Sequence, residues 1–156
     1  MANTYTQIYI HSVFAVQGRR SLIPRHHREE LCKYTSGIVQ NRGQKLIAIN
    51  NEPDHMHLFV GLQPTIALSD LIRDVKAGSS GFINEQKWIP GKFNWQEGFG
   101  AFSHSRSELD RVVKYILNQE EHHRKKTFKE EYLKMLKEFC VTYDQEYLFR
   151  FDEENE

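Results

Sequence analysis

Two histidines separated by a single residue are the part of this sequence best suited to chemistry. His55 and His57 stand within residues 55–60, which read HMHLFV. Successive side chains of a β-strand point to opposite faces, so both imidazoles would project from one face while the apolar side chains project from the other. Two neutral imidazoles on a stiff strand supply half of a divalent-metal site. The same spacing also occurs where histidines are partly exposed packing residues, so a metal site requires further ligands.

A tyrosine and a glutamine one helical turn apart are the next candidates. Residues 107–119 predict an amphipathic helix in which Tyr115 lies at the edge of the apolar stripe and Gln119 lies on nearly the same face. Such a pair alone is usually part of a helix that packs on a core. Two imidazoles and an amide oxygen, however, would form a neutral site that suits a divalent ion able to bind phosphate oxygens. A phenol beside that ion can attack a phosphodiester, giving a phosphotyrosine linkage to DNA.

The elements that must position these side chains follow from the hydrophobic periodicity. The order is strand, helix, strand, strand, helix, strand and then further helices. This order predicts an α+β protein of the ferredoxin-like or RRM-like split βαβ type, a four-stranded antiparallel sheet with helices on one face plus C-terminal helices. We expect strands at 4–16, 44–50, 55–60 and 96–104, and helices at about 24–42, from an N-cap at Thr65, from an N-cap at Ser107 and at 130–139.

The bulk composition fits one compact domain over residues 1–156. Hydrophobic residues make up 39% of the chain and charged residues 27%, and no apolar run approaches the roughly 20 residues of a membrane span. The first residues lack the features of a secretion signal, and Cys32 and Cys140 have no ligand or redox spacing, so a cytoplasmic location is expected.

The net charge of zero is distributed unevenly. The sequence ends in an acidic tail at about 150–156, and four acidic residues lie in its last five positions, 152–156. Residues 1–151 therefore hold 21 basic against 17 acidic side chains, a net of +4. A mildly basic body is compatible with a nucleic-acid partner, although it is far short of the balance that would indicate one by itself.

Four separated segments, in order, resemble the single-tyrosine HUH transposases of prokaryotic insertion sequences, the insertion sequence 200 like transposases. The matching segments are 51–60 (NEPDHMHLFV), 95–99 (WQEGF), 103–110 (SHSRSELD) and 113–119 (VKYILNQ), with two histidines just behind the last. The resemblance implies an enzyme that cleaves and rejoins single-stranded DNA at hairpin-marked element ends through a 5′-phosphotyrosine intermediate. It also implies a homodimer in which the tyrosine helix can serve the partner's histidines.

The same resemblance assigns the site residue by residue. It implies that His55 and His57 bind a divalent metal, Mg²⁺ or Mn²⁺, with Gln119 as the third ligand and Tyr115 as the nucleophile. No motif defines the hairpin-binding residues. Four basic side chains are candidates from charge and position, and a solvated basic face is the alternative for each: Arg19, Arg20, Lys76 and Arg124.

Two other functions remain open from the residues alone. A non-catalytic module that binds single-stranded nucleic acid could stack bases on sheet aromatics such as Tyr9, Phe59 and Phe99. A metal-dependent phosphoesterase could use the same histidines with water as the nucleophile.

Overall fold

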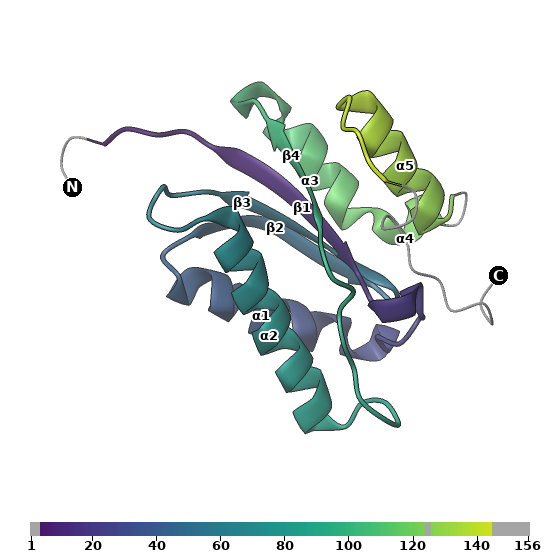
Figure 1. Cartoon of the computed structure of the whole chain (residues 1–156). Helices are drawn as coiled ribbons and strands as arrows, with labels where there is room; N and C mark the ends of the chain where they lie inside the picture. Colours follow the sequence, from purple (N-terminus) through teal and green to yellow (C-terminus); the bar gives the residue numbers. More distant parts are fainter. Residues whose placement is uncertain (1–3, 124–125, 145–156) are drawn as a thin grey trace.

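The computed structural model describes residues 4–123 and 126–144 and contains the predicted four-stranded antiparallel sheet (Figure 1). Its strands are β1 (Tyr9–Ala15), β2 (Lys45–Glu52), β3 (His55–Gly61) and β4 (Gly100–His104), in the order β2-β3-β1-β4. The prediction of a ferredoxin-like sheet is therefore confirmed. The strand β3, which carries both histidines, is paired on both sides and is held firmly in place.

Two helices, α1 (Arg28–Asn41) and α2 (Leu68–Gln86), cover one face of the sheet (Figure 1). Two 3-10 turns, η1 (Gln17–Arg19) and η2 (Arg25–His27), connect β1 to α1. The larger hydrophobic core lies under these helices and takes Met56, Leu58 and Val60 from β3. These are the alternate residues of the strand, as the period of two requires.

Three further helices lie on the opposite face of the sheet (Figure 1). They are α3 (Leu109–Leu117), which follows the 3-10 turn η3 (Arg106–Glu108), α4 (Gln119–His123) and α5 (Phe128–Glu138). Phe59 on β3 packs against Val112 and Ile116 of α3, whereas Val13 and Phe102 pack against α5. The predicted C-terminal helices thus bury the histidine-bearing face of the sheet. In the part of the chain described, no helix combines the length and apolar character needed to cross a membrane.

Helices α2 and α3 do not begin at the predicted N-caps, and neither has a side-chain cap hydrogen bond. Helix α2 begins at Leu68, and the Thr65 hydroxyl instead accepts a hydrogen bond from Gln44 Nε2 at 3.5 Å. Ser107 lies inside the 3-10 turn before α3, where its hydroxyl is paired with that of Ser105. At the other end, α3 stops at Leu117 and Gln119 begins α4, so the two predicted site residues on one helix lie on two consecutive helices.

Two glycines in α2 allow a test of the packing between α1 and α2. A Cβ atom at Gly78 would lie 2.5 Å from Ile38 Cδ1, whereas a Cβ at Gly81 meets nothing within 4 Å. Gly81→Ala is expected to raise the free energy of unfolding by about 1 kcal/mol, because alanine loses less backbone entropy in a helix. Gly78→Ala should gain less or destabilise the protein, because Ile38 must move. Denaturant unfolding of both variants checks this, and equal gains would contradict the close approach of the helices.

Candidate active site

The two histidines of β3 lie in the closed space between the sheet and the C-terminal helices. Both side chains are fully buried. They share a face with Val13 and Ala15, their neighbours across the β1–β3 pairing, while Met56 between them belongs to the opposite core. The predicted division of the strand into an apolar face and an imidazole face is therefore confirmed. The alternative expectation that this strand face is partly exposed is wrong, because α3 and α5 cover it.

Each imidazole has a partner at its Nδ1 atom. His55 Nδ1 lies 2.6 Å from Asp54 Oδ1, and His57 Nδ1 lies 2.8 Å from His11 Nε2. When Nδ1 carries the proton and donates it to such a partner, the lone pair of Nε2 becomes available to a metal. Asp54 and His11 thus favour the tautomers that a metal site needs.

His11 is suited to accept this hydrogen bond because it stays neutral. Burial is the main cause that holds its pKa well below the ordinary value, and the nearby His57 and His104 lower it further. The imidazole is buried on β1 and its ring stacks on His57 with 5.0 Å between centroids. The alternation of side chains along a strand puts His11 on the same face of β1 as Tyr9 and Val13. It gives no indication that His11 contacts His57.

A glutamate from α5 completes a three-residue group that could hold a metal ion. Glu131 is buried, and its Oε1 lies 3.0 Å from His57 Nε2. One ligand atom from each of His55, His57 and Glu131 lies within 4.8 Å of the others. Two imidazole nitrogens and a carboxylate oxygen are a donor set that first-row divalent ions accept, so the residues fit such an ion.

The sequence analysis missed Glu131, although a signal was present. Phe128 and Met135 of this helix are both buried, and Phe128 lies before the predicted helix start at residue 130. With these two residues counted, position 131 falls inside the apolar stripe, three residues after Phe128 and four before Met135. A carboxylate at such a position is rarely buried without a partner and is therefore a candidate ligand.

Tyr115 lies beside the histidines of its own chain. Its ring centroid is 5.9 Å from that of His57, and the side chains of Glu131 and Gln119 lie near enough to the phenol to affect its pKa. Burial, followed by the negative charge of Glu131, raises the pKa of the phenol above its ordinary value. The hydroxyl therefore keeps its proton near neutral pH in this arrangement.

Gln119 is brought to the tyrosine by the break between α3 and α4. Its buried side chain donates from Nε2 to the carbonyl oxygen of Tyr115 at 3.1 Å. The end of α3 is tied to the sheet, because Asn50 Nδ2 donates to the carbonyl oxygen of Ile116 at 2.9 Å. The structure thus places Gln119 next to Tyr115, and its role as a metal ligand stays a prediction.

A cleft opens beside Tyr115 between α3 and α5. Its volume is about 270 Å³, and Tyr115 and Glu131 contribute to its wall. Three cationic side chains also line it, Arg111, Lys126 and Lys134, and a phosphodiester is attracted to such groups. The tyrosine is thus accessible from outside although most of its surface is buried.

Of the four basic residues predicted to bind DNA, the structure describes the side chains of Lys76 and Arg20. Lys76 on α2 donates from Nζ to the carbonyl oxygens of Gln96 and Gly98, and burial lowers its pKa to about 8. Arg20 is exposed just after η1, which contains Arg19. Arg124 and the acidic tail lie outside the described residues. A DNA-binding role for these four residues stays a prediction.

Removing the His11 imidazole should weaken metal binding more than it weakens the fold. His11→Leu is expected to lower the affinity for Mn²⁺ by about 10- to 100-fold, because His57 loses the acceptor that orients its ring. The rise in melting temperature with Mn²⁺ concentration measures this affinity. His11→Gln, whose amide oxygen can accept the same bond, should restore part of it. His104→Leu, which removes a neighbouring imidazole, is the control, and equal losses in both leucine variants would contradict a specific role for His11.

The fold and the site define a DNA-processing protein of the transposase class. The model of the family described as "Transposase IS200 like" matches residues 4–119, most of the chain, and the chain belongs to this family. This confirms the resemblance seen in the sequence. Comparison with curated protein sequences gives no match.

Two solved structures share the fold. One is a protein from Deinococcus radiodurans R1 named as a candidate transposase, with 21% identity, a TM-score of 0.58 and coverage of 75% of this chain and 94% of that chain. The other is a REP-associated tyrosine transposase bound to a REP hairpin, with 17% identity, a TM-score of 0.58 and coverage of 78% and 72%. At these identities the likeness supports the fold alone.

Proposed function

We propose that this transposase cleaves and rejoins single-stranded DNA through a covalent bond between Tyr115 and the 5′-phosphate. The observation that carries the proposal is that Tyr115 packs against His57, whose Nε2 lies 3.0 Å from Glu131 Oε1, and that Tyr115 and Glu131 line the same cleft. A nucleophile, a group able to accept its proton and two candidate metal ligands therefore meet in one chain. This is the arrangement that nucleophilic catalysis requires.

The reaction can be written with the residues of the chain. The Tyr115 oxygen attacks the scissile phosphorus and its proton passes to the nearby Glu131 carboxylate. The bond from phosphorus to the 3′-oxygen breaks, and that oxygen takes up a proton to become a hydroxyl. The 3′-hydroxyl of another DNA end later attacks the phosphotyrosine and releases Tyr115. The number of phosphoester bonds is conserved, so no ATP is consumed.

His55, His57 and Glu131 are the residues that would hold the divalent ion, Mg²⁺ or Mn²⁺. When bound, such an ion supplies Lewis acidity that withdraws charge from the phosphate and favours the phenolate. Asp54 and His11 orient the two imidazoles through their Nδ1 atoms. Gln119 is the additional ligand that the sequence predicts.

The proposed DNA partner is a single strand that carries a hairpin. The REP-associated tyrosine transposase with the same fold is bound to a REP hairpin. Arg19, Arg20, Lys76 and Arg124 are our candidates for the hairpin contacts, and Arg111 and Lys134 line the cleft at Tyr115. A homodimer remains part of the proposal. Because Tyr115, His55, His57 and Glu131 of one chain lie together, we propose that Tyr115 acts at the histidines of its own chain.

A denaturing gel tests the proposed reaction directly. The protein is incubated with Mg²⁺ or Mn²⁺ and labelled single-stranded hairpins taken from the DNA that flanks its gene, beside a sample with chelator. A labelled band at the mass of protein plus DNA should form only with metal, and mass spectrometry of its peptides should find the modification on Tyr115. Bound DNA without a covalent band would contradict the proposal.

The two alternative functions make different predictions. A phosphoesterase would turn over small phosphoesters after Tyr115→Phe, since water would be its nucleophile. A base-stacking module on the open sheet is disfavoured by the structure, because Phe59 is fully buried under α3 and Tyr9 packs in the same cluster. Of the three aromatic residues predicted to stack bases, Phe99 alone has a substantially exposed ring.

A further inference from the structure

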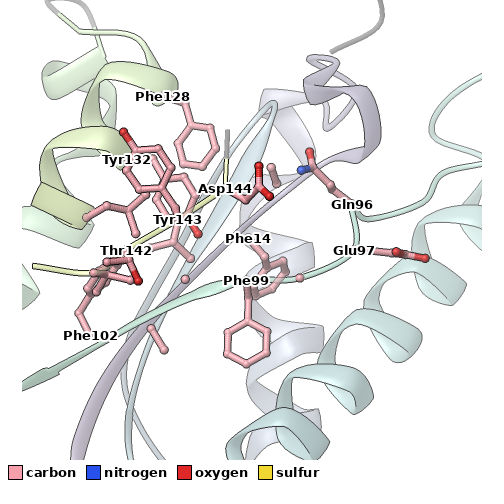
Figure 2. A pocket seen from close by; sticks show the side chains of 17 residues that line it. Phe14, Gln96, Glu97, Phe99, Phe102, Phe128, Tyr132, Thr142, Tyr143 and Asp144 are labelled. Atoms are coloured by element: carbon pink, nitrogen blue, oxygen red, sulfur yellow. The ribbon is translucent and has the colours of Figure 1, made fainter. Parts of the chain in front are cut away.

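A second hollow lies on the other side of α5 from the Tyr115 cleft. It has a volume of about 300 Å³ and is bounded by β4 and the segment before it, by α5 and by residues 141–144 (Figure 2). This volume is at the lower end of the range for small-molecule sites. Figure 2 shows Tyr132 and Tyr143 along one side of the hollow, Phe99 at one end, and Gln96 and Asp144 toward the other end.

Aromatic side chains make up much of the wall and part of it is open to solvent. Phe99 is 36% exposed and Tyr143 is 45% exposed, so both rings are available to a ligand. Tyr132 lies so close to β4 that a Cβ atom at Gly100 would be 2.5 Å from its ring. Rings presented in this way suit a flat, unpaired nucleobase, since every base has a face that can stack.

The polar groups of the hollow are suited to a base and not to a phosphate. Among the described residues that line it, none is lysine or arginine, whereas two carboxylates, Glu97 and Asp144, and the polar side chains of Gln96 and Thr142 contribute oxygen atoms. Carboxylate and amide oxygens accept hydrogen bonds from exocyclic amino groups such as N4 of cytosine. An unpaired thymine offers only its single ring N3–H, whereas an amino group has two hydrogens that two of these oxygens can accept, so the wall favours an amino-bearing base.

One ring links this hollow to the candidate metal site. Phe128 lines the hollow, and its ring stacks on His55 with 4.1 Å between centroids and on Tyr132 with 5.5 Å. The hollow is therefore separated from His55 by the single ring of Phe128. The geometry points to a pocket for one unpaired, amino-bearing nucleobase beside the scissile phosphate, an inference that rests on the proposed function.

Photochemical cross-linking tests the pocket without requiring cleavage. We would irradiate the full chain with two pools of random single-stranded oligonucleotides. One pool carries 5-iodocytosine at a fixed position and the other carries 5-iodouracil there. A chelator is present, so that no metal-dependent cleavage occurs. We expect cross-links to Phe99 or Tyr143, identified by peptide mass spectrometry, with a several-fold higher yield from iodocytosine. Cross-links confined to other segments would overturn the inference, as would equal yields from the two bases.

A second test measures the binding of single-stranded DNA to variants of Phe99 and Tyr143. Both side chains are exposed, so we expect their replacement to leave the fold intact. Replacing Phe99 and Tyr143 together by alanine should weaken binding of the cytosine-containing strand about tenfold, the effect expected for a lost stacking platform. Tyr34→Ala is the matched control, because Tyr34 is 43% exposed and stacks on Phe82 among the α1 and α2 helices. Unchanged binding in the double variant would also overturn the inference.

The Tyr115 adduct, measured on the same preparations, separates this inference from the proposed function. A normal adduct without cross-links in the hollow would overturn the base pocket alone. Cross-links in the hollow without any metal-dependent adduct would overturn both the proposed reaction and the placement of the base beside a scissile phosphate.

Discussion

Tyr115→Phe is expected to lower the yield of the covalent DNA adduct by at least about 1,000-fold, because it removes the attacking oxygen and leaves the ring in place. The remaining ring keeps its packing near His11 and His57, with centroids 6.3 Å and 5.9 Å away in the present structure. Binding of the hairpin should therefore change little. The adduct is measured on denaturing gels, and hairpin binding by fluorescence anisotropy.

Tyr132→Phe is the matched control for this substitution. Tyr132 is also a largely buried tyrosine, and burial raises its pKa to about 12, but it lies on the far side of Phe128 from the histidines. Its loss of a hydroxyl should leave the adduct unchanged. An adduct that survives Tyr115→Phe and disappears with Tyr132→Phe would show that the wrong tyrosine has been assigned.

Mixing two inactive variants shows which histidines Tyr115 serves. Because Tyr115 packs against His57 of the same chain, a mixture of Tyr115→Phe and His57→Ala should form no more adduct than either variant alone. Recovery of adduct in the mixture would require the tyrosine of one chain to act at the histidines of another, as the resemblance to dimeric transposases allows.

The sequence predicted the features of this site that depend on short-range periodicity. Alternation along residues 55–60 was sufficient to place both imidazoles on one face, and a period of 3.6 placed Tyr115 and Gln119 near each other. The order of strands and helices along the chain was sufficient to predict the split βαβ sheet, since few sheet topologies are compatible with that order. In each case a repeated pattern over several residues carried the information.

Contacts between distant segments could not be predicted in the same way. His11 reaches His57 across 46 positions, and Glu131 reaches it from a helix whose direction over the sheet no local pattern specifies. The position of α5 is set by packing of Phe128, Met135 and Leu136 on the sheet, which depends on shape and not on periodicity. The break at Asn118 was also missed, because no glycine or proline marks it.

Glu131→Gln should reduce metal-dependent adduct formation by about 100-fold or more while it preserves the shape of the side chain. The substitution removes the negative charge that would bind the cation, and it also removes the group placed to accept the Tyr115 proton. In the wild type, Mn²⁺ at 100 times its dissociation constant should stabilise the fold by about 2.7 kcal/mol. Most of that stabilisation should be lost in Glu131→Gln.

Two comparisons make this result specific to a ligand. Glu130→Gln changes the exposed neighbour on the same helix and should alter neither the adduct nor the Mn²⁺ effect on stability. Gln119→Ala tests the residue that the sequence predicts as a ligand, and it should raise the metal concentration needed for half-maximal rate. If Gln119→Ala shifts the metal titration and Glu131→Gln does not, the third ligand comes from α4, and the carboxylate of α5 serves Tyr115 alone.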